Sequence, residues 1–390
     1  MEQLIQKVGS KLDGYPINVR ETSSLKEIED ILHAVLFVPE IRIKSKVINE
    51  LITYLGSKFI DPGYKIKVFV AYKNSEPSGF VISQIDPYYT SYSRKCGTFG
   101  WLHADDFQTC KMLIKKCERF TKKNGVRKLR GNINFPKNLG GIGIQFMGFE
   151  QEMLYGVAYN NPNSKTLEYL DLLGYKRESE YSCVRVEQKT WDKGKKIDEG
   201  IEFRYFTLKE LKTMVLEIGN LAKNSFYEIL PDASGKNRIF EFFDAFSQVP
   251  NSFKKLPDRF DPKSYSDIPQ FVEALETCDL EKIEICAPMA FDKQTGELVG
   301  ALLGLHDIFQ AWKGVPITRV NVDTAMVKKG YYGKGIFSAL NNLGQLTARI
   351  FGIDYFEGTA IWSNNSRAID TIFPHCKPVR KHYIFQKRVK

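Results

Sequence analysis

The feature that most constrains the fold of this 390-residue chain is an internal repeat in the order of its predicted elements. A short strand at 17–21, followed by a helix that Ser24 would cap, returns at 201–206 with an offset of 184 residues. A two-stranded hairpin at 68–86 returns at 285–307 with an offset of 221. A third set of landmarks has an offset of 227 and pairs Gly125 with Gly352, Gly131 with Gly358, and Asn138 with Asn365. This repeat predicts two copies of one α/β fold, each with a mixed sheet.

The repeat also predicts where two domains meet. The polar, charged segment KTWDKGKKIDEG at 189–200 reads as a linker, so we expect one domain at 1–190 and a second at 197–390. The change of offset from 184 to 221 places about 37 extra residues in the second domain, at about 231–282. The first domain has its own glycine-rich insert at 139–164. Such inserts either cover a substrate site or only decorate the fold.

The second repeat contains a strand, a basic glycine-rich turn and a helix in direct succession. Apolar and β-branched residues at 320–327 predict a buried strand, and apolar residues at helical spacing predict a helix at 336–350. The turn between them has glycines at 330, 333 and 335 and lysines at 328, 329 and 334. A turn of this kind points backbone N–H groups at the start of a helix dipole, which suits a phosphate. The spacing of its glycines matches neither a Walker loop nor a dinucleotide fingerprint.

The segment Val327–Leu340, VKKGYYGKGIFSAL, resembles the coenzyme A loop of the GNAT superfamily of N-acyltransferases. The positions that match the family pattern are Val327, Tyr331, Gly333, Lys334, Gly335, Ile336 and Leu340. Two positions depart from it: Tyr332 stands where Arg or Gln is usual, and Phe337 stands where a small residue is usual. A strand followed by Asn365 and Ala368 resembles the family's next unit. The resemblance covers roughly the last hundred residues and implies two tandem GNAT-like acyl-CoA N-acyltransferase domains.

The two halves differ in chemistry at this loop. The offset of 227 places Asp106 opposite Gly333 and Gln108 opposite Gly335, so the first half has no glycine there. The carboxylates of Asp105 and Asp106 would repel a pyrophosphate and would instead favour a helix N-terminus. We therefore expect the first domain to be a degenerate GNAT-like copy that binds no cofactor and helps to form an acceptor pocket between the domains.

The resemblance also implies a reaction and a set of binding residues. It implies acetyl-CoA or another acyl-CoA as co-substrate, and direct attack on the thioester by the amine of a small amine or amino-acid-like acceptor. Strand N–H groups would polarise the carbonyl, and binding would align the reacting groups. The residues implied for cofactor binding are Ala325, Met326, Val327, Tyr332, Gly333, Lys334, Gly335, Ile336, Phe337 and Asn365.

The acid and base of the reaction are harder to place. In the family, a tyrosine seven residues after the helix asparagine acts as the acid, and here that position is Ile372. The remaining candidates for the acid are Tyr383, His375 and Cys376. Asp323 or Glu357 could take the amine proton, directly or through water. A strand tyrosine more often packs and a strand aspartate is often solvated, so these structural roles stay open.

Composition limits the partners. A net charge of +10 suits an anionic ligand such as coenzyme A. Nucleic acid is not an expected partner, because the basic residues are dispersed and no nucleic-acid-binding motif appears. The seven cysteines form no CxxC pair and the five histidines are scattered, so we expect no metal and a cytoplasmic location. No apolar run reaches the 18 residues of a membrane span.

Two alternatives remain open at this point. One is an aminoacyl, peptidyl or long-chain acyl transferase of the tandem-GNAT type. The other is a non-catalytic GNAT-fold binding protein. Ile372 and Phe337 favour the second alternative, whereas the intact Gly-Lys-Gly turn opposes it.

Overall fold

The computed structural model describes residues 16–91, 94–186, 197–206, 208–225, 236–251, 260–276, 288–365 and 376–389. Every structural statement below concerns these ranges. Ile372, His375 and the predicted helix around them lie outside the described residues.

The first half follows the predicted order of elements. Ser24 caps its first helix by accepting a hydrogen bond from the N–H of Glu27 at 3.3 Å, as the sequence predicts. Its elements are β1 (Asn18–Thr22), α2 (Leu25–Val35), η1 (Ile41–Ile43), α3 (Lys44–Ile60), β2 (Lys65–Lys73), β3 (Glu76–Ile85), β4 (Thr90–Ser91), β5 (Arg94–Lys95), β6 (Gly97–Ala104), α4 (Phe107–Lys123), β7 (Lys128–Gly131), α5 (Lys137–Gly140), β8 (Ile144–Met147), α6 (Thr166–Leu172) and β9 (Lys176–Val186).

The second half repeats this order with additional helices. The strand predicted at 201–206 is found as β10. The elements are β10 (Ile201–Tyr205), α7 (Leu208–Thr213), α8 (Val215–Ser225), α9 (Lys236–Ser247), η3 (Pro262–Tyr265), α10 (Pro269–Glu276), β11 (Pro288–Asp292), β12 (Leu298–His306), α11 (Ile308–Trp312), β13 (Arg319–Val327), α12 (Ile336–Ile350), β14 (Tyr355–Trp362) and β15 (Lys377–Arg388).

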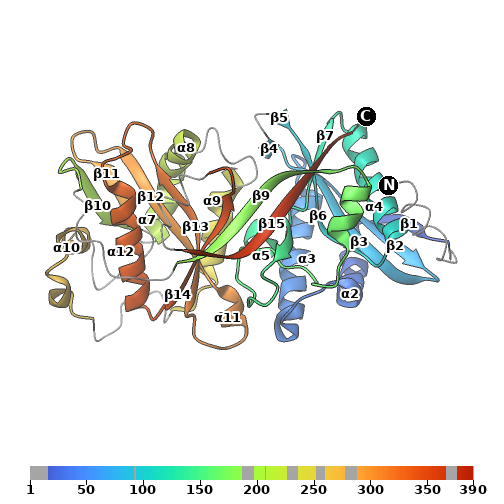
Figure 1. Cartoon of the computed structure of the whole chain (residues 1–390), viewed down its shortest axis with the longest axis horizontal. Helices are drawn as coiled ribbons and strands as arrows, with labels where there is room; N and C mark the ends of the chain where they lie inside the picture. Colours follow the sequence, from blue (N-terminus) through green and yellow to red (C-terminus); the bar gives the residue numbers. More distant parts are fainter. Residues whose placement is uncertain are drawn as a thin grey trace.

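One mixed sheet runs through both halves (Figure 1). Its strand order is β1-β2-β3-β6-β7-β15-β9-β14-β13-β12-β11-β10, with β8 paired to β15. Counted inward from its two ends, the order brings equivalent strands of the two halves to equivalent positions, from β1 and β10 at the edges to β15 and β9 at the centre. The pairs β6–β7 and β13–β14 are parallel, whereas the other neighbours on this path are antiparallel. The predicted repeat is therefore confirmed as a two-fold arrangement of one α/β unit.

The final strands of the two halves are exchanged. β15 pairs with β7 of the first half, and β9 pairs with β14 of the second half, while β9 and β15 also pair with each other. In Figure 1 these two strands cross between the halves. The pattern of apolar residues does not distinguish exchanged from unexchanged final strands. In either arrangement β9 and β15 would have antiparallel neighbours of the same kind. Since β9 and β15 cross the boundary, the division at 1–190 and 197–390 remains a prediction.

Equivalent glycines allow one helix in each half to approach the sheet closely. A Cβ atom at Gly79 of β3 would lie 2.6 Å from a Thr109 side-chain atom of α4. A Cβ atom at Gly300 of β12 would lie 2.6 Å from the side chain of Ile336 in α12. On α4, Cys110 and Cys117 are fully buried. None of the described helices combines the length and apolar character that a membrane crossing requires.

Candidate functional site

The first component of the site is an opening between β13 and β14. The two strands pair only over Arg319–Val322 and Tyr355–Gly358. Beyond this point β13 keeps its pairing with β12 as far as Val327, but β14 diverges from it. A register shift lies at Leu303/Gly304 of β12 and leaves Asp323 of β13 without a paired position. The backbone edge from Asp323 to Val327, which includes Ala325 and Met326, therefore borders the opening.

The second component is the glycine-rich loop that joins β13 to α12. Gly330, Gly333 and Gly335 have φ of 95°, 85° and 77°, a left-handed conformation that glycine adopts without steric cost. Gly335 is the N-cap of α12 and provides no side-chain cap, and the first helical bond runs from Ala339 N to Gly335 O. The N–H groups of the first turn thus meet no capping side chain. They form the positive end of a 15-residue helix, a common place for phosphate binding.

Ion pairs and a hydrogen bond hold this loop against neighbouring segments. Lys328 Nζ lies 2.5 Å from both carboxylate oxygens of Glu297, and the Tyr331 hydroxyl donates to Asp292 at 2.9 Å. Lys334 Nζ lies 3.0 Å from Asp198 Oδ2. These contacts fix the loop without occupying the helix N-terminus.

The equivalent loop in the first half is six residues shorter. Phe99 and Val322 lie opposite Gly131 and Gly358 in their parallel pairs, which gives a strand offset of 223. The helix N-caps are Asp106 and Gly335, which gives an offset of 229, six more than 223. The constant offset of 227 is therefore wrong across the loop, because the length difference lies within it. Gly335 corresponds to Asp106 and not to Gln108.

Asp106 closes the helix N-terminus that Gly335 leaves open. Its Oδ1 accepts a hydrogen bond from Thr109 N at 2.8 Å, and its other carboxylate oxygen forms an ion pair with Lys73. The predicted helix-capping role of Asp106 is confirmed. A carboxylate at this position occupies the N–H groups that a phosphate would need.

The arrangement of these elements matches known structures. No protein-family model and no curated protein sequence matches the chain. Among solved structures, it is similar to a tandem GNAT protein from the clavulanic acid biosynthesis pathway, with a TM-score of 0.54 over 96% of this chain and 99% of that one. The chain has a tandem GNAT fold. The sequence identity is 11%, so this similarity concerns the fold alone.

Two further solved structures are similar in fold to this chain. A GCN5-related N-acetyltransferase from Sphaerobacter thermophilus aligns at 12% identity and a TM-score of 0.50, over 97% of this chain and 98% of that one. A probable N-acyltransferase from Enterococcus faecalis aligns at 8% identity and a TM-score of 0.52, over 96% of this chain and 73% of that one.

Within this tandem GNAT fold, the candidate base Glu357 lies in the interior. Its carboxylate accepts hydrogen bonds from Arg380 Nε at 2.8 Å and Arg380 Nη2 at 3.0 Å, and from the Tyr355 hydroxyl at 2.7 Å. Glu357 is fully buried and Arg380 is 2% exposed. Burial and the neighbouring carboxylate raise the pKa of Tyr355 to about 12. These contacts are those of a buried ion pair, in which no part of the Glu357 side chain is exposed to solvent.

The candidate acid Tyr383 lies away from the opening. On β15 it pairs with Ile144 and Glu180, and its ring stacks on Phe146 with centroids 4.1 Å apart. β15 and β13 are three strand spacings apart in the sheet, or about 14 Å. The structure therefore does not bring Tyr383 next to Asp323. Asn365 ends the described segment after β14, where its N–H donates to Trp362 O at 2.8 Å.

The first-half insert binds to the base of the opening, which the sequence does not reveal. Asn321 is fully buried on β13; its Nδ2 donates to Tyr155 O at 2.9 Å, and its Oδ1 accepts from Thr359 at 2.6 Å. Tyr155 N in turn donates to Asp307 Oδ1 at 3.2 Å. Burial raises the pKa of Asp307 to about 6. At least part of the insert at 139–164 therefore joins the two halves.

Proposed function

We propose that this protein transfers an acyl group from an acyl-coenzyme A, with acetyl-CoA as the simplest donor, to the amino group of a small acceptor. The observation that carries the proposal is the combination found in the second half: diverging parallel strands, a long glycine-rich loop and a helix N-terminus without a side-chain cap. The first half lacks the long loop and has a carboxylate cap, so we assign cofactor binding to the second half alone.

The residues present fit such a ligand. Gly330 and Gly333 have open space around the position of a Cβ atom, so phosphate oxygens can approach the backbone there. N–H groups from Gly335 to Phe337 would donate to the pyrophosphate. Lys334, which is about one-third exposed, can turn from Asp198 toward a phosphate, because an exposed ion pair contributes at most about 1 kcal/mol.

The acyl-CoA would supply an activated thioester, and the chain would position it and manage the proton. The backbone N–H groups of β13 between Ala325 and Val327 would polarise the carbonyl at the opening. Asp323 is half-buried on the same edge, where Thr324 Oγ1 donates to its Oδ2 at 2.7 Å. We assign the amine proton to Asp323 in preference to Glu357, since Glu357 is buried and already paired with Arg380.

The proposal is tested by a pair of substitutions at one position. Gly335→Asp places a carboxylate against the pyrophosphate site, and repulsion at about 4 Å costs between about 1 and 4 kcal/mol, or about 5-fold to 1000-fold in affinity. Gly335→Ala introduces the same left-handed strain without the charge, so it is the matched control. Coenzyme A, acetyl-CoA and longer acyl-CoAs are titrated calorimetrically against both variants and the wild type.

The expected order of affinity is wild type, then Gly335→Ala, then a much weaker Gly335→Asp. Thiol release in the presence of a panel of amines then measures transfer. Equal affinity of the two variants would contradict the assigned phosphate site. Binding without thiol release for any amine would favour the non-catalytic alternative, and a preference for longer acyl chains would favour the long-chain one.

A further inference from the structure

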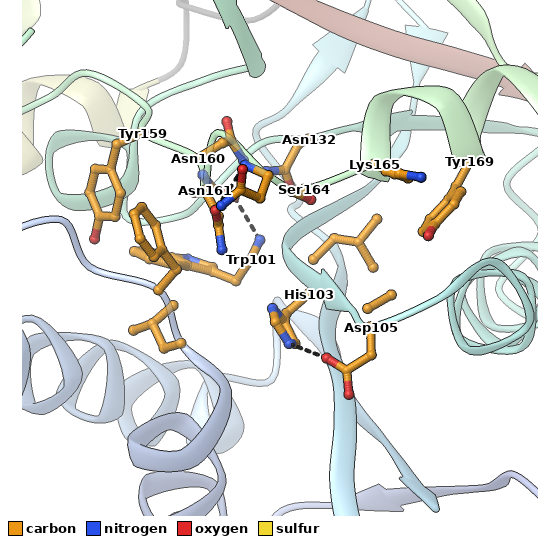
Figure 2. A pocket seen from close by; sticks show the side chains of 16 residues that line it. Trp101, His103, Asp105, Asn132, Tyr159, Asn160, Asn161, Ser164, Lys165 and Tyr169 are labelled. Carbon is orange, nitrogen blue, oxygen red and sulfur yellow. Dashed lines mark hydrogen bonds and ion pairs between the residues drawn. The ribbon is translucent and has the colours of Figure 1, made fainter. Parts of the chain in front are cut away.

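A second cavity lies in the half that lacks the phosphate loop. It has a volume of about 390 Å³ and is located where β6 and β7 diverge, between the end of β6 and the insert (Figure 2). This volume falls within the range of about 300–1000 Å³ that is usual for small-molecule sites. The cavity occupies the place in the first half that the opening between β13 and β14 occupies in the second.

Amide and aromatic side chains dominate the lining. Five asparagines line the cavity, at positions 132, 134, 160, 161 and 163, together with Trp101, Tyr159 and Tyr169. The charged side chains are Lys165 and Asp105, which oppose each other in sign, and His103 lies 3.0 Å from the Asp105 carboxylate. A lining with little net charge and many amides suits a neutral ligand with several hydroxyl groups.

Two residues that line this cavity, Asn132 and Tyr159, each have a buried polar atom without a hydrogen-bond partner. Asn132 is 2% exposed, and its Oδ1 accepts no hydrogen bond. The buried hydroxyl of Tyr159 is likewise unpaired, and burial raises its pKa, so it remains a donor. Buried polar groups are normally paired, because leaving one unsatisfied destabilises the fold. A ligand hydroxyl that donates to Asn132 and another that accepts from Tyr159 would satisfy both atoms.

Trp101 gives the cavity a rigid aromatic wall. Its N–H donates to Asn134 Oδ1 at 2.6 Å, and its indole Nε1 donates to Phe135 O at 2.8 Å. Asn134 is fixed in turn by donating to Gly140 O at 2.9 Å. Trp101 also has φ of 52°, an unusual backbone conformation for a bulky residue that is often retained at binding sites. The wall is thus preorganised, which lowers the entropic cost of binding.

We propose that this first-half cavity binds a small neutral polyhydroxylated molecule of monosaccharide size, with Asn132 and Tyr159 as its polar contacts and Trp101 as a rigid part of its wall. A phosphorylated or coenzyme A-like ligand is disfavoured here, since Asp105 lies at the cavity and Asp106 caps the adjacent helix. The proposal does not depend on acyl transfer in the second half.

The test uses the full chain with methyl glucoside and N-acetylglucosamine as neutral probes and glucose 6-phosphate as the charged one. Calorimetry and ligand-observed NMR should detect saturable binding of at least one neutral probe and binding at least tenfold weaker for the phosphate. Tyr159→Phe removes only the unpaired hydroxyl. It should weaken binding about tenfold, or about 1.4 kcal/mol, while the melting temperature of the ligand-free protein stays at or above that of the wild type.

Tyr205→Phe is the matched control, because the Tyr205 hydroxyl is buried in the second half and bonds Thr347 Oγ1 at 2.7 Å. It should lower the melting temperature and leave probe binding unchanged. Absence of saturable binding of both neutral probes to the wild type would overturn the proposal. Unchanged probe affinity in Tyr159→Phe, or tighter binding of glucose 6-phosphate, would overturn it as well.

Discussion

The ion pair between Glu357 and Arg380 provides the sharpest test of how the two halves are held together. The two residues lie on β14 and β15, and β9 lies between these strands, so the side chains meet across it. Arg380→Met would leave the Glu357 carboxylate buried without its two charge-assisted hydrogen bonds from Arg380. Breaking a buried pair in this way costs about 3–5 kcal/mol of the free energy of unfolding.

Replacing both partners should largely restore stability. In the double variant Glu357→Leu/Arg380→Met no charge is left buried, and exchanges of this kind are often neutral or stabilising. The free energy of unfolding is measured by urea titration for the wild type, both single variants and the double variant. We expect strong coupling, with the double variant more stable than either single one.

A further variant, Glu357→Gln, distinguishes a structural role from a catalytic one. If Glu357 were the general base, Glu357→Gln would abolish transfer while stability stayed near that of the wild type. A loss of less than about 1 kcal/mol in Arg380→Met would also refute the reasoning, because a fully buried carboxylate cannot lose its partner at so small a cost.

Three further predictions follow from the described geometry. Asp323→Asn should lower the rate of transfer at least tenfold with coenzyme A affinity unchanged, because it removes the proton acceptor and no phosphate contact; thiol release and calorimetry measure the two effects. The segment 199–390 expressed alone should self-associate, since β14 loses β9 and β15 loses β7 and β9; light scattering reports its mass. His382→Gln should lower the free energy of unfolding near pH 6.5, and the difference from the wild type should shrink as the pH falls to about 4. Urea titrations across this range measure the difference.

The sign of the histidine effect follows from its burial. His382 is 2% exposed, and burial lowers its pKa to about 4 from the ordinary 6.5. The unfolded chain therefore binds a proton in this pH window that the native state does not, so the wild type loses up to about 3 kcal/mol on acidification. A constant difference between variant and wild type across the window would contradict this account. A monomeric, folded 199–390 segment would contradict the predicted self-association. An unchanged rate of acyl transfer in Asp323→Asn would contradict the role assigned to Asp323.

The sequence predicted the fold well because the periodic elements and their glycines repeat. Gly79 and Gly300 lie at equivalent contacts, and Gly131 and Gly358, which the offset of 227 pairs, lie at equivalent points of β7 and β14. Inside the loop the prediction failed, because the offset of 227 was taken from landmarks after the helix and then applied to a loop before the helix, where the two halves differ in length. The exchange of β9 and β15 also left no sequence signal, because β-strand patterning records burial and not which chain segment supplies the neighbour.

The candidate site was predictable only where backbone conformation dictates residue type. Glycines at φ of 77° to 95° leave a direct mark on the sequence, so the loop was identified. Glu357 and Tyr383 are ordinary residues on strands, and only coordinates distinguish an interior ion pair or a stacked ring from a catalytic group. The unpaired atoms of Asn132 and Tyr159 are likewise properties of packing, which no single-sequence pattern records.

The central position of β15 has a consequence for how the protein is made. β9 ends at Val186 and β15 begins at Lys377, so about 190 residues are synthesised between them, or about 10 to 40 s of translation. Throughout this interval β7 lacks β15, and β9 lacks β15 and, until that strand is made, also lacks β14. The first half therefore keeps unpaired strand edges at β7 and at both sides of β9 during most of the synthesis of the second half.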